Sequence, residues 1–346
     1  MFSKNLKYYR LQKNMTKKEL ASKVDVTPMA ISYYENGERK PSMEIIKRLA
    51  NVLEVRVTDF LSSRNTNLVF SHGEFRKNSS LTKMQQDYIR ESVEEYLCRF
   101  YTAVDILGGE VLPKEPVANQ LKLSGNIEND AQAMRKYLRL AESGPIGNLI
   151  ELLENRGILV HVYETPNKDF SGMNGLVNGR PYIIVNGTMS PERIRSTIVH
   201  EIAHLLFQWN EDMDDKEEEH MATAISGAFL FPKEDALREL GIRRSAITND
   251  MALICREYGI SMYLLVKRAS LCGIISSQVE KNFYISANQK GWRTKEPIRI
   301  DREEPMLFDQ LVFRAVCEDE ISVQRGAELL KKPYEYVVSQ CFAEGE

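Results

Sequence analysis

The sequence predicts an α+β protein that is mainly helical and carries one small β-sheet near its middle. Apolar residues recur at helical spacing through most of the 346 residues. Three short segments around glycine-rich turns, ILVHVYE, FSGMNGLVN and RPYIIVNG, are instead typical of strands. The chain begins with a run of short helical segments and ends with further helical pairs. We therefore expect all-helical regions on both sides of the sheet.

The composition is that of a globular protein with more than one core. Hydrophobic residues make up 43% and charged residues 27%, and 346 residues are too many for one ordinary core. No apolar run approaches the roughly 20 residues that cross a bilayer, and the start, MFSKNLKYYR, lacks the apolar stretch of a signal peptide. A cytoplasmic protein is expected. The five cysteines form no C-x-x-C pair, which argues against a disulfide framework or a thiolate zinc site.

The net charge of −3 is unevenly distributed along the chain. Residues 1–64 carry 13 Lys and Arg against 7 Asp and Glu, a balance of +6, while the remainder has a balance of −9. A basic N-terminal segment followed by an acidic remainder indicates that only the N-terminal part binds a polyanion. Charge by itself is equally consistent with an ordinary solvated basic surface.

The N-terminal segment has the start and stop signals of short helices. Thr16 and Glu19 form a capping box, and Thr27 caps the next helix, PMAISYYEN, which ends at Gly37. Pro28 takes the first position of that helix, where its missing N–H costs nothing. Two short helices joined by a turn of a few residues form a helix-turn-helix, whose second helix enters the major groove of DNA.

The outward face of that second helix indicates which side chains meet DNA. Ala30 and Ile31 are expected to pack inward. Met29, Ser32 and Tyr33 then face the groove, and nearby polar and basic residues are placed for phosphates. The expected DNA-contacting residues are Lys17, Thr27, Pro28, Met29, Ser32, Tyr33, Asn36, Arg39 and Lys40.

This stretch, down to ISYYENGERKPS, resembles the XRE or lambda-repressor-like family. The resemblance covers about 57 residues and implies binding to double-stranded operator DNA and a role in transcription regulation. The alternative is a small helical bundle that docks another protein.

Residues 64–125 are expected to form a linker and one long helix. SSRNTN and HGEFRKNSS are polar and typical of linkers, and His72 is expected in a surface loop. Between about residues 82 and 107, apolar residues recur at helical spacing until two glycines end the pattern. Such a stripe indicates a core face or the seam of a homodimer. VLPKEPVANQ then reads as an extended connection.

The segment MSPERIRSTIVHEIAHLLFQ carries the strongest chemical signal. Ser190 is a helix cap, and His200 and His204 leave one helix face about a turn apart. Two neutral imidazoles at that separation can share one Zn²⁺. Glu201 would lie beside the metal, placed to take a proton from polarised water. Two core histidines satisfied by the backbone are the alternative.

Two histidines and a water leave a tetrahedral zinc site one protein ligand short. Downstream of the acidic loop NEDMDDK, another helix has Ala222 and Ser226 on its inward face. Glu219 lies three residues before Ala222 and seven before Ser226, so it is the expected third ligand. Glu218 and His220 are alternatives, and a solvated acidic turn also fits these residues.

These segments resemble the ImmA/IrrE metallopeptidases, from AQAMRKYLRL through SGPIGNLIELLENRGILV, FSGMNG and IIVNGTMSPERIRSTIVHEIAHLL to the segment 219–232, with GWRTKEP continuing the likeness. The resemblance implies a zincin-like, gluzincin-type zinc endopeptidase. It also implies that the enzyme cuts a helix-turn-helix repressor and so controls genes of mobile elements, stress responses or defence. The chain departs from the family at Ser196, Ala203 and Thr223, where an aromatic residue, glycine and asparagine are common.

The expected boundaries are a helix-turn-helix domain at 1–63, the linker and long helix at 64–125, a metallopeptidase core at 126–235 and a helical C-terminal region at 236–346. The strand around residues 182–186 is expected to pair with an extended substrate by strand addition. The last helical pair is a candidate dimer contact.

Two main functions agree with these motifs, beside a third interpretation as the antitoxin-like or regulatory half of a two-gene module. The first is a DNA-binding transcriptional regulator with a zinc-dependent endopeptidase domain that cleaves a helix-turn-helix repressor, either a separate protein or one of its own kind. The second is an XRE-family repressor whose peptidase-like domain senses a ligand or partner without proteolysis. Glu201 favours the first, because a purely structural zinc site needs no base.

Overall fold

A computed structural model describes residues 2–61, 65, 67–73, 80–165, 167–210, 212–293, 296 and 298–342. Most of the two predicted linkers, and residues 294, 295 and 297 of the GWRTKEP stretch, lie outside these ranges. The chain is mainly helical with a small mixed sheet, which confirms the predicted α+β class. It divides into two compact units. The first comprises Met1–Phe70, Glu74–Leu112 and Phe308–Glu346, and the second Ser71–Gly73 and Pro113–Leu307.

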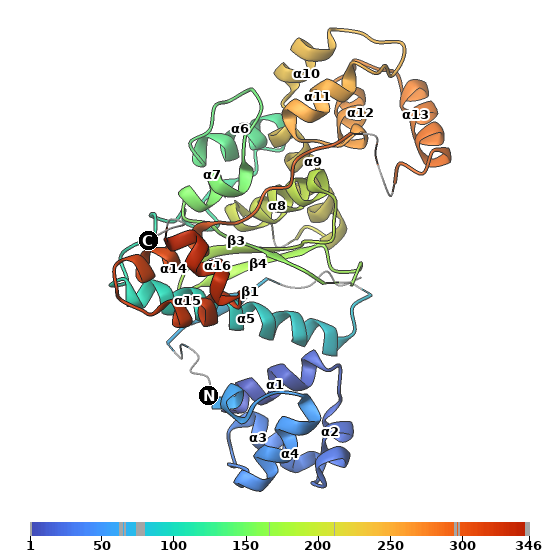
Figure 1. The fold of residues 1–346 in the computed structure, drawn as a ribbon. Helices are drawn as coiled ribbons and strands as arrows, with labels where there is room; N and C mark the ends of the chain where they lie inside the picture. The colour runs from blue at the N-terminus through green and yellow to red at the C-terminus, as the bar shows by residue number, and fades with distance from the viewer. Residues whose placement is uncertain are drawn as a thin grey trace. The chain divides into compact units, whose positions relative to one another are not determined.

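The first unit begins with four short helices and a 3₁₀ turn: α1 (Phe2–Gln12), α2 (Lys17–Val24), α3 (Pro28–Asn36), α4 (Met43–Leu53) and η1 (Val57–Leu61) (Figure 1). The predicted capping box at Thr16 is present, and Thr27 accepts a hydrogen bond from the N–H of Ala30. Gly37 ends α3 at φ 77°, a left-handed conformation that favours glycine. Leu6, Leu20, Ile31, Leu49 and Phe60 are fully buried in the small core between these helices.

The long helix α5 (Lys83–Ile106) follows, capped by Thr82. Its apolar stripe is buried, and the ring of Phe100 lies 5.5 Å from that of Phe308. Phe308 belongs to α14 (Leu307–Cys317), which continues into α15 (Val323–Leu330) and α16 (Tyr334–Cys341). The C-terminal helices thus cover part of the stripe within this unit (Figure 1).

The second unit contains α6 (Ile127–Tyr137), α7 (Leu149–Asn155) and the strands β3 (Leu159–Tyr163), β4 (Gly172–Val177) and β5 (Arg180–Asn186). The strand order is β1-β4-β5-β3, where β1 is Phe70–His72. β5 pairs antiparallel with β4 and parallel with β3. A separate pair joins β2 (Leu121–Lys122) to β6 (Phe207–Gln208).

This topology corrects two expectations. β5 cannot accept a substrate strand, because both of its edges are already paired with β3 and β4. His72 does not lie in a surface loop: it belongs to β1, is half-buried, and places Nδ1 2.5 Å from the hydroxyl oxygen of Tyr182.

The remaining helices of this unit are α8 (Pro191–Leu206), α9 (Asp215–Leu230), α10 (Lys233–Leu240), α11 (Met251–Tyr258), α12 (Met262–Leu271) and α13 (Ser277–Gln289). α8 packs against β4 and β5 and against α9 (Figure 1). Its apolar side chains Ile198 and Ile202 are fully buried, which fixes the rotation of the helix about its axis. Among the described residues, no helix combines the length and apolarity needed to cross a membrane.

Candidate functional site

Helices α8 and α9 bring three potential metal donors together. The Nε2 atoms of His200 and His204 lie 3.2 Å apart. Oε2 of Glu219 lies 3.3 Å from Nε2 of His200, and its Oε1 lies 3.6 Å from Nε2 of His204. Among the described residues, these three form the group of His, Cys, Asp or Glu side chains whose donor atoms converge as a metal site requires.

The donor spacing fits a tetrahedral zinc ion. With zinc–ligand distances of 2.0–2.1 Å, two donors at the corners of a tetrahedron lie about 3.4 Å apart. The three separations in this group, 3.2, 3.3 and 3.6 Å, lie close to that value. Imidazole nitrogen and carboxylate oxygen are also the donor types that zinc takes in catalytic sites.

The other nitrogen of each imidazole also has a partner on α9. Nδ1 of His204 lies 2.9 Å from Oε1 of Glu218, and Nδ1 of His200 lies 3.3 Å from the hydroxyl of Thr223. Metal-binding histidines commonly donate their second ring N–H to such oxygens, which fixes the tautomer and the ring orientation. Glu218 therefore contacts the nitrogen of His204 that does not face the other donors, and it is not one of the three converging donors. His220 is exposed and also lies outside that group.

Glu201 is buried and lies outside the donor group. Its Oε2 accepts a hydrogen bond from Nδ2 of Asn174 on β4 at 2.8 Å. Gly172 lets β4 approach α8 closely, since a Cβ there would lie 2.8 Å from Cγ2 of Thr197. The result is a fixed carboxylate that can accept a proton.

Sequence reasoning missed Asn174 and the role of Glu218. The FSGMNG stretch was part of the family resemblance, but a single asparagine in a strand carries no signal for a partner 27 positions away. The sequence offers Glu218 as an alternative ligand or as part of a solvated acidic turn, because helical spacing alone does not distinguish the two nitrogens of an imidazole.

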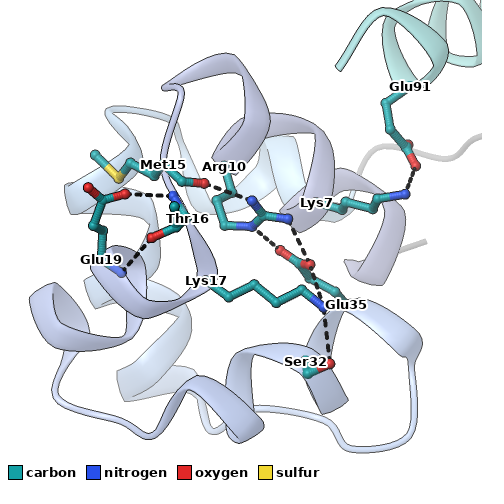
Figure 2. Close-up of polar contacts among 9 residues, drawn as sticks. All are labelled: Lys7, Arg10, Met15, Thr16, Lys17, Glu19, Ser32, Glu35 and Glu91. Carbon is teal, nitrogen blue, oxygen red and sulfur yellow. Dashed lines mark hydrogen bonds and ion pairs between the residues drawn. The ribbon is translucent and has the colours of Figure 1, made fainter. Parts of the chain in front are cut away.

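The predicted DNA-contacting residues lie on and around α3. Met29 and Tyr33 are exposed to 60% and 36%, and Ile31 is buried as expected. Ser32 is half-buried and accepts a hydrogen bond from Nζ of Lys17 at 3.0 Å (Figure 2). The other predicted contacts are exposed: Thr27, Pro28, Asn36, Arg39 and Lys40.

A buried ion pair holds α1 against α3. The Arg10 guanidinium donates to both carboxylate oxygens of Glu35, at 2.5 and 3.0 Å, and to the carbonyl of Met15 at 2.7 Å (Figure 2). Nζ of Lys17 lies 3.7 Å from the same carboxylate, so this predicted phosphate contact is partly neutralised by Glu35. Two-point pairing of a guanidinium with a carboxylate restricts the orientation of α3 on its scaffold.

α1 also contacts the long helix of the same unit. Nζ of Lys7 lies 2.8 Å from Glu91 of α5, and Nζ of Lys4 lies 3.1 Å from Glu94 (Figure 2 draws the first pair). Burial lowers the pKa of Lys7, but the hydrogen bond and charge of Glu91 outweigh it and leave the pKa above its ordinary value. Neither lysine belongs to the predicted DNA-contacting set, so this contact does not use the outward residues of α3.

Comparisons with known proteins match two separate segments of the chain. Residues 6–60 match a family described as helix-turn-helix, and residues 153–270 match a family described as IrrE N-terminal-like domain. An uncharacterized HTH-type transcriptional regulator, YqaE of Bacillus subtilis (strain 168), is 36% identical over 70 residues. That match covers 20% of this chain and 60% of the relative. No solved structure matches the chain.

These matches confirm both resemblances expected from the sequence. The chain joins an XRE-type helix-turn-helix domain to an IrrE-like peptidase-family domain.

Proposed function

We propose that this protein is a DNA-binding transcriptional regulator whose IrrE-like domain is a zinc-dependent endopeptidase. The helix-turn-helix match and the exposed face of α3 support DNA binding. The convergence of His200, His204 and Glu219, with Glu201 held beside them, supports metal-assisted peptide hydrolysis. The position of Glu201 carries the proposal, because a metal site that only stabilises the fold needs no additional buried carboxylate.

In this proposal each side chain has one task. His200, His204 and Glu219 hold the ion, while Glu218 and Thr223 orient the two imidazoles. A zinc ion there would supply Lewis acidity toward the scissile carbonyl and the attacking water.

Glu201 would accept a proton from the attacking water and deliver it to the leaving amine. The hydrogen bond from Asn174 joins this carboxylate to β4 and so restricts its orientation.

The proposed substrate is a helix-turn-helix repressor, either a separate protein or a second copy of this chain. Cleavage would remove the repressor and induce genes of a mobile element, a stress response or a defence module. A homodimer is also proposed, since operator DNA with two half-sites is bound by paired helix-turn-helix domains.

The test is cleavage of helix-turn-helix repressors encoded next to this gene, compared between the wild type, Glu201→Gln and the control Glu217→Gln. Glu217 is an exposed residue of α9, the helix that carries Glu219, and contributes no donor to the site. We expect the wild type and Glu217→Gln to cleave, and Glu201→Gln to keep its zinc and lose cleavage by at least about a hundredfold. A wild type that binds DNA and zinc but leaves every such repressor intact would favour a regulator whose peptidase-like domain senses a ligand or partner.

A further inference from the structure

The outer edge of β4 is covered by a short segment that arrives from elsewhere in the chain. In the order β1-β4-β5-β3, β4 lies between β5 and β1. The N–H of Gly73, directly after β1, donates to the carbonyl of Asn174 at 2.8 Å. Ser71–Gly73 belong to the second unit, while the chain before and after them belongs to the first. Three residues of the connecting segment have thus become part of the peptidase-like sheet.

This edge is next to the candidate catalytic base. Asn174 accepts a hydrogen bond from Gly73 with its backbone carbonyl and donates one to Glu201 with its side chain. One residue therefore links the docked segment to the carboxylate.

The docked segment fits closely, and glycine is required for it. A Cβ at Gly73 would lie 2.9 Å from both the backbone oxygen and the side-chain oxygen of Asn174. The φ of Gly73 is not in the left-handed region, so the restriction is one of space and not of backbone conformation. Opposite, a Cβ at Gly175 would lie 2.6 Å from the carbonyl oxygen of Ser71. Two glycines therefore allow the two backbones to approach.

The residue between them anchors the segment by its side chain. Nδ1 of His72 lies 2.5 Å from the hydroxyl of Tyr182, a fully buried residue of β5. The segment is thus held by a backbone hydrogen bond to β4 and by a side-chain hydrogen bond to the neighbouring strand. This combination is typical of peptides that add a strand to a sheet edge.

We propose that the outer edge of β4 is the surface that presents an extended peptide to Glu201, and that this chain's own segment Ser71–Gly73 occupies it. The peptide that fits is extended, has glycine beside Asn174, and has histidine before that glycine to reach Tyr182. A substrate must displace the chain's own segment before it can pair with β4. The part of this inference that concerns a substrate rests on the proposed peptidase function. The docking of Ser71–Gly73 on β4 does not depend on proteolysis.

Docking is tested with the full chain, the variant Gly73→Val and the control Ser80→Val. Ser80 is exposed and lies outside the docked segment, so its substitution introduces the same side chain and leaves Ser71–Gly73 unchanged. Hydrogen exchange should show a protected amide at Gly73 in the wild type and the control. In Gly73→Val we expect protection of the segment to be lost, because the added side chain meets Asn174.

The probe for the vacated edge is a fluorescent synthetic peptide of residues 67–80, NLVFSHGEFRKNSS. We expect Gly73→Val to bind it at least tenfold more tightly than the wild type or Ser80→Val. A peptide carrying valine in place of its glycine should not bind. Retained protection in Gly73→Val, or lost protection with no gain in peptide binding, would overturn the inference.

Cleavage assays separate this inference from the proposed function. If no form of the protein cleaves any repressor, the peptidase proposal fails while the exchange and peptide-binding results still decide the docking. If the wild type does cleave, Gly73→Val should raise kcat/KM for a separate substrate several-fold. An unchanged kcat/KM in that variant would count against the docked segment as a competitor of substrate.

Discussion

Asn174 on strand β4 donates a hydrogen bond of 2.8 Å to the carboxylate of Glu201 on helix α8. The donor comes from the sheet and the acceptor from the helix that carries His200 and His204, so the bond depends on the packing of one element on the other. It selects one orientation for the carboxylate of the candidate base.

Removing that donor should reduce catalysis without removing the metal. We expect Asn174→Ala to lower kcat/KM for repressor cleavage by about tenfold to a hundredfold, because Glu201 loses the bond that orients it, while zinc content stays unchanged. The matched control is Asn282→Ala, an exposed asparagine on α13. Unchanged kcat/KM in Asn174→Ala would show that Glu201 needs no orientation by β4.

Zinc binding should depend on Glu218, the partner of His204, as well as on the three proposed ligands. Elemental analysis of the purified wild type should find about one zinc per chain, and His204→Ala should abolish it. Glu218→Gln should weaken zinc affinity by about 10–100-fold, because Nδ1 of His204 loses a charged partner. Glu217→Gln serves as the control in a competition titration with a chelator. Equal affinities for the two glutamine variants would refute the role assigned to Glu218.

DNA binding should depend on the outward face of α3. Mobility shifts on DNA upstream of this gene should weaken by at least about tenfold in Ser32→Ala combined with Tyr33→Ala, because both lie on the helix expected in the major groove. Binding should also weaken steeply with salt, since phosphate contacts release counterions. Met43→Ala removes an exposed side chain of α4 outside the predicted set, so it should bind as the wild type does. Normal binding by the double variant would place the DNA contacts elsewhere.

The free energy of unfolding of the second unit should depend on pH through the ionisation of Glu296. Its Oε2 accepts the N–H of Met262 at the start of α12, at 2.7 Å. Burial raises the pKa of Glu296, the hydrogen bond from Met262 partly offsets this, and the charge of Glu192 adds to the rise. The pKa of Glu296 in the folded protein is therefore above the ordinary value of 4.5. Its stabilising contribution is fully present below pH 4.5, where the carboxyl is protonated in the folded and unfolded states. This contribution is lost as the pH rises through the pKa of the folded protein.

Glu296→Gln keeps an oxygen acceptor but cannot ionise. It should therefore be more stable than the wild type at pH 7, and the difference should disappear below about pH 4.5. Thermal unfolding of both proteins across this range measures the effect, with the exposed Glu142→Gln as a control for charge removal. A variant that is less stable at pH 7 would mean that the hydrogen bond outweighs the cost of burying the charge.

Much of the local structure follows from patterns within a few residues. Thr16 with Glu19, Thr27 with Pro28, and Ser190 with Pro191 mark helix starts that the structure confirms. Ser190 makes no side-chain capping hydrogen bond, although α8 begins at Pro191. The three glycine-flanked strands also lie where predicted.

The sequence by itself determined the elements, the two family resemblances and the face shared by His200 and His204, because each depends on residues close together along the chain. Tertiary structure decided which groups from different elements meet. Asn174 meets Glu201 across 27 positions, and His72 meets Tyr182 across 110. It also decided that β5 is an inner strand and that the chain's own residues cover β4. The spacing of apolar residues in the sequence predicts which side of a helix or strand is apolar. Strand order and contacts between distant residues depend on how all the elements pack together.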